Sequence, residues 1–218
     1  MQVIRFEDLA DHLANGKDFI IELGEQRGIG SSSMIIRKCG KTGLIDRGAA
    51  FEGTGSSKIT TFAVGGNLEE IYIDWMIFTH VHADHILQIV PTVLSHEESR
   101  VFFSRKTLEE LKIVLADSLS IQRKEVRKAD SLGLQAPKVE FTEEDVAIFL
   151  TRAEVGFYNI VNTDEEDEWI TFEDWPDWDF GFTFSGHTPG AFISCIKTPD
   201  GDGIVATGDV SGHDQETT

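Results

Sequence analysis

The stretch Thr79-His80-Val81-His82-Ala83-Asp84-His85 directly follows the apolar run Trp75-Met76-Ile77-Phe78. It places three imidazoles and one carboxylate where a buried strand should give way to a helix. Because alternate residues of an extended segment share a face, we expect His80 and His82 to point the same way. Asp84 and His85 come where the chain turns and can face a second, nearby point. The stretch therefore predicts an α/β fold with a group of ligands at a strand–helix junction.

These side chains favour metal chemistry. Imidazole nitrogens and carboxylate oxygens bind zinc, manganese and iron, and two ions about 3.5–4 Å apart can share a hydroxide nucleophile. We predict a centre for two divalent ions. Zinc is the first candidate, and manganese or iron are alternatives because the same ligands accept all three.

A length of 218 residues allows one large domain, or one and a half, and we predict one domain covering residues 1–218. With 40% hydrophobic residues and fifteen Phe the chain can furnish a core. No apolar run is long enough to cross a membrane, and the segment 1–9 has charges in place of a signal-peptide core. Cys39 and Cys195 do not make a disulfide framework. We expect reduced thiols in a cytoplasmic protein.

The net charge of −19 comes from 38 acidic and 19 basic residues. This charge repels polyanions and disfavours nucleic-acid binding by this chain alone. Nucleic acid is still a possible substrate, and the chain is also a possible homo-oligomer. Much of the acidity lies in residues 164–168 and 173–179, which we predict to be solvated loops. The nearby Trp169, Trp175 and Trp178 are expected to pack at a sheet edge.

Periodicity and turn residues predict the remaining elements. Strands are expected over 2–6, 18–23, 34–38, 44–48, 75–79, 101–104, 157–161, 179–185, 191–197 and 204–207. Helices are expected over 7–14, 67–73, 84–94 (with a kink or early end at Pro91), 106–132 and, after a capping box at Thr142, 143–151. Residues 28–33 are predicted to be a turn and residues 49–58 a loop. Residues 105–154 form a helical insertion between strands.

Three further features carry ligand-type side chains at strand ends. Asp46 ends the apolar strand Leu44-Ile45. His187 lies in the turn Gly186-His187-Thr188-Pro189-Gly190, and Asp209 ends Thr207-Gly208-Asp209. Placing a His between glycines and a proline costs folding entropy unless the turn matters. His12 and His96 are interpreted as surface or helix residues.

Taken in this order, these motifs resemble the metallo-β-lactamase fold superfamily over about residues 18–212. The resemblance implies an αββα sandwich, incomplete at its C-terminus, with two metals at one edge of the sheets. It implies that His80, His82 and His187 bind the first metal, that Asp84 and His85 bind the second, and that Asp209 bridges both. Asp46 would support these ligands from behind.

Within the superfamily, the opening Gly30-Ser31-Ser32-Ser33 and the long helix around Ala116–Leu119 resemble nucleases that carry a β-CASP insertion. The final His ligand of that family is expected well beyond Asp209, and His213 is poorly placed to replace it. We therefore predict that six of seven ligands are present and that the final ligand-bearing segment is not.

The predicted function is metal-assisted hydrolysis with Asp84 and Asp209 as catalytic residues, of which Asp84 helps to orient the hydroxide. Phosphodiester cleavage in RNA or DNA is the first substrate class, on family analogy alone. The alternatives are a small-molecule hydrolase acting on a thioester, lactone or β-lactam, and a non-catalytic metal-binding scaffold.

Overall fold

The structure is a computed structural model that describes residues 2–3, 8–23, 32–52, 61–63, 68, 71–162 and 168–210. Its larger sheet has seven strands in the order β1-β2-β3-β4-β7-β8-β9. Strands β2, β3 and β4 pair antiparallel, whereas β4, β7, β8 and β9 pair parallel. These seven strands are Gln2–Val3, Phe19–Glu22, Met34–Lys38, Lys41–Ile45, Trp75–Ile77, Arg100–Ser104 and Asn159–Val161.

Both faces of this sheet are buried, which explains why its central strands are apolar almost throughout. On β7, Met76 belongs to the core under the helices, whereas its neighbours Trp75 and Ile77 belong to the core between the sheets. On β8, Phe103 faces the helices and Phe102 faces the second sheet. The larger sheet therefore separates two hydrophobic cores, one on each of its faces.

The second sheet has four antiparallel strands in the order β10-β11-β12-β13. They are Glu168–Phe172, Trp175–Phe184, Phe192–Lys197 and Gly203–Ala206. Phe180 and Phe182 on β11 pack against Phe102 of the larger sheet, with ring centroids 4.9 and 5.3 Å apart. This aromatic contact joins the two sheets.

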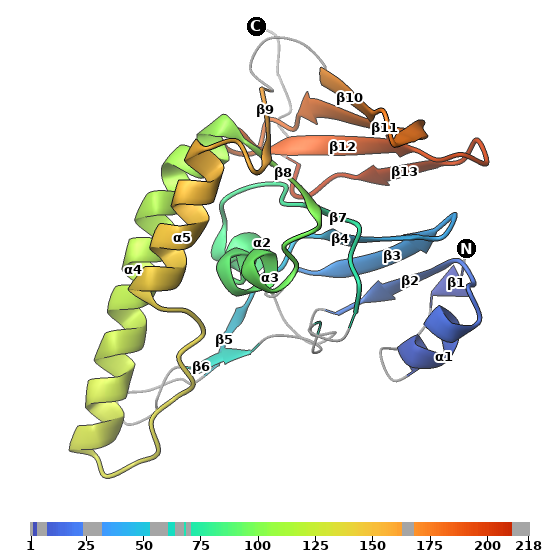
Figure 1. Cartoon of the computed structure of the whole chain (residues 1–218). Helices are drawn as coiled ribbons and strands as arrows, with labels where there is room; N and C mark the ends of the chain where they lie inside the picture. The colour runs from blue at the N-terminus through green and yellow to red at the C-terminus, as the bar shows by residue number, and fades with distance from the viewer. Residues whose placement is uncertain are drawn as a thin grey trace, which may run out of the picture.

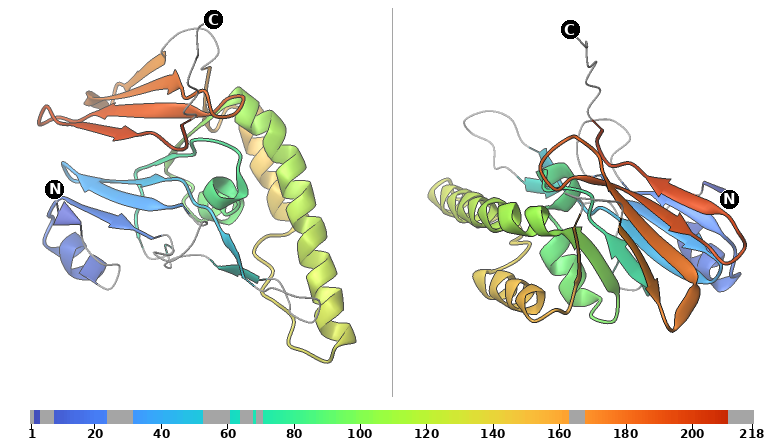
Figure 2. Two further views of the ribbon diagram at one scale, coloured as in Figure 1. Left: turned by 180° about the vertical axis from the view of Figure 1, so that it is seen from behind. Right: turned by 90° about the horizontal axis from the view of Figure 1, so that it is seen from above.

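The helices lie on the other face of the larger sheet (Figures 1 and 2). They are α1 (Leu9–Ala14), α2 (Ala83–Ile86), α3 (Ile89–Ser95), α4 (Arg105–Ser131) and α5 (Glu143–Glu154). Among the described residues no helix covers the outer face of the four-stranded sheet (Figure 1). The mixed α/β class and the paired sheets are confirmed, and three of the four layers of the predicted sandwich are described.

The long helix and the capping box agree with the sequence. Leu111 and Leu115 of α4 are fully buried, as their spacing predicts. At α5 the Thr142 hydroxyl accepts from the backbone N–H of Asp145, while the Asp145 carboxylate accepts from the N–H of Thr142. The predicted helix over 84–94 is broken into α2 and α3, and Pro91 lies in the first turn of α3, where no N–H is needed.

Three predictions were wrong. Within the supposed loop 49–58, Ala50–Glu52 forms β5 and pairs with β6 (Thr61–Ala63), a long-range pairing that local composition does not reveal. The helix over 67–73 is not seen at Leu68 or over residues 71–73. There, the N–H of Ile71 donates to the carbonyl of Leu68 in a turn, and residues 67, 69 and 70 lie outside the described residues.

The third error concerns the acidic region 173–179, which is a hairpin rather than a solvated loop. Residue Glu168 also lies in a strand, β10, that the sequence did not predict, whereas residues 163–167 lie outside the described part. Arg100 helps to hold this acidic hairpin, because it stacks on Phe172 and Trp175 and forms an ion pair with Asp174. Trp178 is buried, but Trp169 is half exposed on the outer face.

The other predicted elements agree with the structure to within a few residues, although the strand over 2–6 is described only as β1 and the turn over 28–31 lies outside the described residues. His12 lies on α1, and His96 ends α3, where its ring bonds backbone carbonyls. Both cysteines are free thiols. None of the helices described here is long and apolar enough to cross a membrane.

Candidate metal centre

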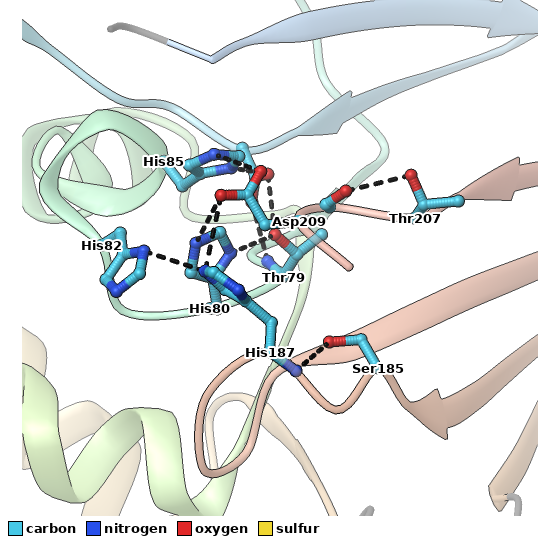
Figure 3. Close-up of polar contacts among 10 residues, drawn as sticks. Thr79, His80, His82, His85, Ser185, His187, Thr207 and Asp209 are labelled. Atoms are coloured by element: carbon cyan, nitrogen blue, oxygen red, sulfur yellow. Dashed lines mark hydrogen bonds and ion pairs between the residues drawn. The ribbon is translucent and has the colours of Figure 1, made fainter. Parts of the chain in front are cut away.

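The candidate centre lies where β7 ends and where loops of the second sheet reach the same edge. His80, His82, His187 and Asp209 each offer a ligand atom, and these four atoms all lie within 4.8 Å of one another. Figure 3 shows the four imidazoles of His80, His82, His85 and His187 gathered around the Asp209 carboxylate. Three segments that are far apart in sequence therefore converge on one point.

Backbone hydrogen bonds fix the segment that carries His80, His82 and His85. The N–H of Arg47 donates to the carbonyl of His85 (2.7 Å), and the N–H of Gln88 donates back to the carbonyl of Arg47 (2.9 Å). A side chain on Gly48 would place its Cβ 1.6 Å from the Asp84 carbonyl oxygen, so the two backbones touch. Residues 46–48, which follow β4, therefore hold the backbone of the turn into α2 in place.

Asp46 is the buried acceptor behind the ligands and is 1% exposed. Its backbone has a φ of 55°, an uncommon left-handed conformation that Asp tolerates better than most residues. Its carboxylate accepts from the Thr79 N–H (2.7 Å), from the Thr79 hydroxyl (2.8 Å) and from His85 Nδ1–H (2.7 Å). A carboxylate can only accept when ionised, so it fixes the proton of His85 on Nδ1 and directs Nε2 toward the centre.

Thr79 relays the same constraint to His80. Because the Thr79 hydroxyl proton is donated to Asp46, its oxygen accepts from His80 Nδ1–H at 3.0 Å. His80 Nε2 then carries a free lone pair. Sequence reasoning missed Thr79, whose only signal was its position between the buried strand and the first His.

His80 Nε2 provides the test of whether these residues fit a metal. The atom is buried, and no hydrogen-bond partner reaches it among the described residues. It lies 3.9 Å from Asp209 Oδ2. A buried polar atom without a partner is costly and uncommon, but a metal ligand needs this free lone pair. Three imidazoles and a carboxylate are also a suitable donor set for zinc.

Burial, together with the neighbouring imidazoles of His85 and His82, lowers the pKa of His80 to about 3. His80 is therefore neutral at physiological pH, which is the form that binds metals. His85 behaves differently. Burial lowers its pKa, but the hydrogen bond and charge of Asp46 outweigh burial, so the net shift is upward.

His187 and Asp209 reach the centre from the second sheet. His187 Nε2 lies 3.2 Å from His82 Nδ1 and 3.5 Å from Asp209 Oδ2. The hairpin turn 186–190 relies on positive φ angles at both of its glycines. It is tied to the first segment by the Phe192 N–H, which donates to the Thr79 carbonyl at 3.1 Å.

The two oxygens of Asp209 face different histidines. Oδ2 faces His80 and His187, whereas Oδ1 lies 3.4 Å from His85 Nε2. The structure does not place the Asp84 carboxylate in the four-membered group, and the Asp84 carbonyl accepts from the N–H of Ser32. His213 lies outside the described residues.

No protein-family profile matches the sequence, and no curated protein matches it significantly. Among solved structures, the chain is similar to a metallo-beta-lactamase HARLDQ motif mutant from Cronobacter sakazakii, with 14% identity and a TM-score of 0.45 over 89% of this chain and 62% of that one. It is also similar to the metallo-beta-lactamase fold protein YhfI from Bacillus subtilis, with 14% identity and a TM-score of 0.46 over 89% of this chain and 63% of that one.

A protein of unknown function from Enterococcus faecalis gives 15% identity and a TM-score of 0.48 over 89% of this chain and 44% of that one. The chain thus spans under two thirds of the length of these structures. At such identities the roles of individual side chains rest on the geometry of this chain.

Proposed function

We propose that the protein is a metal-dependent hydrolase whose centre is formed by His80, His82, His187 and Asp209. The observation that carries this proposal is the buried, unpartnered His80 Nε2 within a group of four ligand-type atoms. Three segments from two sheets would not be expected to converge on such an atom if it had only a packing role.

A second metal position on the other side of Asp209 is part of the proposal. It is supported by the split of the Asp209 oxygens between His80 and His187 on one side and His85 on the other. Asp84 is proposed as the further ligand there. His85 suits this position because Asp46 bonds its Nδ1 and leaves Nε2 facing Asp209.

A divalent metal in such a site lowers the pKa of a bound water to near neutrality and stabilises the charge that develops on the attacked group. The chain's own contribution is positioning. Asp46 and Thr79 hold the protons of His80 and His85 on Nδ1, away from the centre. Asp209 is half exposed on the solvent side of the centre, where its carboxylate can orient a water or accept a proton.

Nuclease activity, the first substrate class suggested by the sequence, remains a proposal that rests on the family resemblance. The test compares RNA, single-stranded DNA and an acyl thioester with zinc-loaded and manganese-loaded protein. His82→Ala should abolish any true activity, and His12→Ala, on α1, is the matched control. A thioesterase rate that depends on His82, with both nucleic acids intact, would rule out the nuclease.

Metal analysis separates either enzyme from the scaffold alternative. An enzyme centre should hold at least one equivalent of transition metal, and chelation should inactivate it. Less than one equivalent, together with no change in stability on chelation, would favour a scaffold without metal chemistry.

A further inference from the structure

A cavity of about 540 Å³ opens from the candidate centre into the space between the two sheets. His85 and Asp209 form part of its wall at the centre. Most of the remaining wall comes from β2, β3 and β4 on one side and from β13 on the other, and the strand-flanking residues Ser32, Asp46, Thr207 and Gly208 complete it. Its volume is within the range of about 300–1,000 Å³ typical of small-molecule sites.

Most of the wall beyond the centre is apolar, and Ser32 and Thr207 are its polar residues. Ile20, Met34, Ile36 and Ile45 line it from the larger sheet, and Ile204 and Ala206 line it from β13. Ile20, Met34 and Ala206 are only partly buried, so part of this apolar surface still faces the cavity. A neutral chain lying here would gain roughly 0.8 kcal/mol for each methylene removed from water.

The carboxylates are the permanently charged groups among the described residues of the wall. Among the described residues that line the cavity there is no lysine or arginine, and the charged groups besides His85 are Asp46 and Asp209. Asp46 is already committed to Thr79 and His85. A phosphate chain would meet carboxylates and apolar side chains without a compensating cation, whereas a neutral acyl chain meets no such penalty.

We propose that this cavity binds the apolar acyl chain of a neutral ester, thioester or amide, with the carbonyl at the His85 and Asp209 end. The claim rests on the proposed hydrolase function for its chemistry, but the binding of the chain does not depend on metal. Hydrolysis of such a substrate adds water across the bond between the carbonyl carbon and the leaving group. The products are a carboxylic acid and an alcohol, thiol or amine.

The test measures binding to the metal-free 218-residue chain, using hexanamide, octanamide and decanamide as probes and methyl NMR as the readout. The shifts should fall on Met34, Ile36, Ile204 and Ala206. Affinity should rise about fourfold per methylene until the cavity is filled. Ala206→Phe, which fills the cavity from an edge strand, should weaken decanamide binding at least tenfold.

The matched control is Ile193→Phe. Ile193 lies on β12 of the same sheet and faces the opposite side from Phe192 and Ile196, which are in the core between the sheets. It should leave binding unchanged. An affinity independent of chain length, shifts elsewhere, or an Ala206→Phe variant that binds as well as the parent would overturn the proposal. So would a short RNA that shifts the same methyl groups.

The hydrolase proposal can be contradicted independently of the cavity assignment. If the metal-loaded protein shows no hydrolysis that depends on His82 but the amides bind as described, the cavity assignment stands and the enzyme assignment falls. His82→Ala should retain amide binding in the metal-free state, because His82 does not line the cavity.

Discussion

The two halves of the candidate centre are held in different ways. His80 and His85 are buried, and both are bonded to a network built on Asp46 and Thr79. Asp209 is half exposed, and it reaches the centre from a loop whose geometry depends on Gly208. One half is preorganised by buried hydrogen bonds, and the other is placed by backbone turns. Substitutions in the buried half should therefore lower the free energy of unfolding more than substitutions in the exposed half.

Asp46→Ala should have the largest effect. It removes the acceptor of three hydrogen bonds and leaves Thr79 and His85 with unpaired buried donors, so the free energy of unfolding should fall by about 3–5 kcal/mol. Urea denaturation of the metal-free protein measures it. Asp209→Ala, which removes an exposed carboxylate, is the control and should change stability by less than about 0.5 kcal/mol. Equal losses in the two variants would contradict the contrast.

Gly208→Ala should come next. The residue has a φ of 53°, and an added Cβ would lie 2.7 Å from Thr79 Oγ1. We expect a loss of about 2–3 kcal/mol, because backbone strain adds to a collision with the relay. Gly186→Ala shares the positive φ but meets nothing within 4 Å, so it should lose only about 1 kcal/mol. Thermal or urea unfolding of both variants decides, and similar losses would mean that Gly208 has no packing role.

Thr79→Val should cost less stability, about 1–2 kcal/mol, because shape is preserved while one hydroxyl is lost. Metal affinity should fall about 10- to 100-fold, since His80 loses the contact that fixes its tautomer. Thr79→Ser keeps the hydroxyl and should restore the affinity. If Ser fails to rescue, the methyl group rather than the relay matters at this position.

A last prediction concerns the protonation of His80. With a pKa of about 3, His80 in the metal-free protein should remain neutral at about pH 5, where an ordinary histidine is charged. Between pH 6.5 and 3 the unfolded chain binds the extra proton, so the stability contributed by His80 falls as pH falls through this window. Imidazole NMR follows the titration directly. A midpoint near 6.5 would show that the His80 ring is not desolvated.

The sequence predicted which side chains gather at this point better than it predicted the residues that hold them in place. His80, His82, His187 and Asp209 stood at strand ends with distinctive neighbours, and the structure brings them together. Asp46 was expected to assist the histidines, but its bond to His85 and its connection to His80 through Thr79 depend on two strands meeting in space. An ordinary threonine gives no local signal of such a role.

The same limit explains the missed strands. Among the described residues β5 and β6 pair with each other alone, and β10 pairs with a strand reached through a tight acidic turn, so the patterns that reveal them are not local. By contrast, the strands buried on both faces and the long amphipathic α4 carry their periodicity in the sequence itself. The cavity beside the centre arises from the spacing of two sheets, so the sequence pattern of neither sheet predicts it.

The most direct test of the account is the zinc stoichiometry of the purified chain, measured by competition with a chromophoric chelator. We predict at least one tightly bound equivalent in the parent protein and in His96→Ala, because the His96 ring contacts α3 and the carbonyls of Leu68 and Ile71 rather than the centre. His82→Ala and His187→Ala should each lose it. Retention of the full equivalent in His82→Ala, or less than one equivalent in the parent, would contradict the proposed centre.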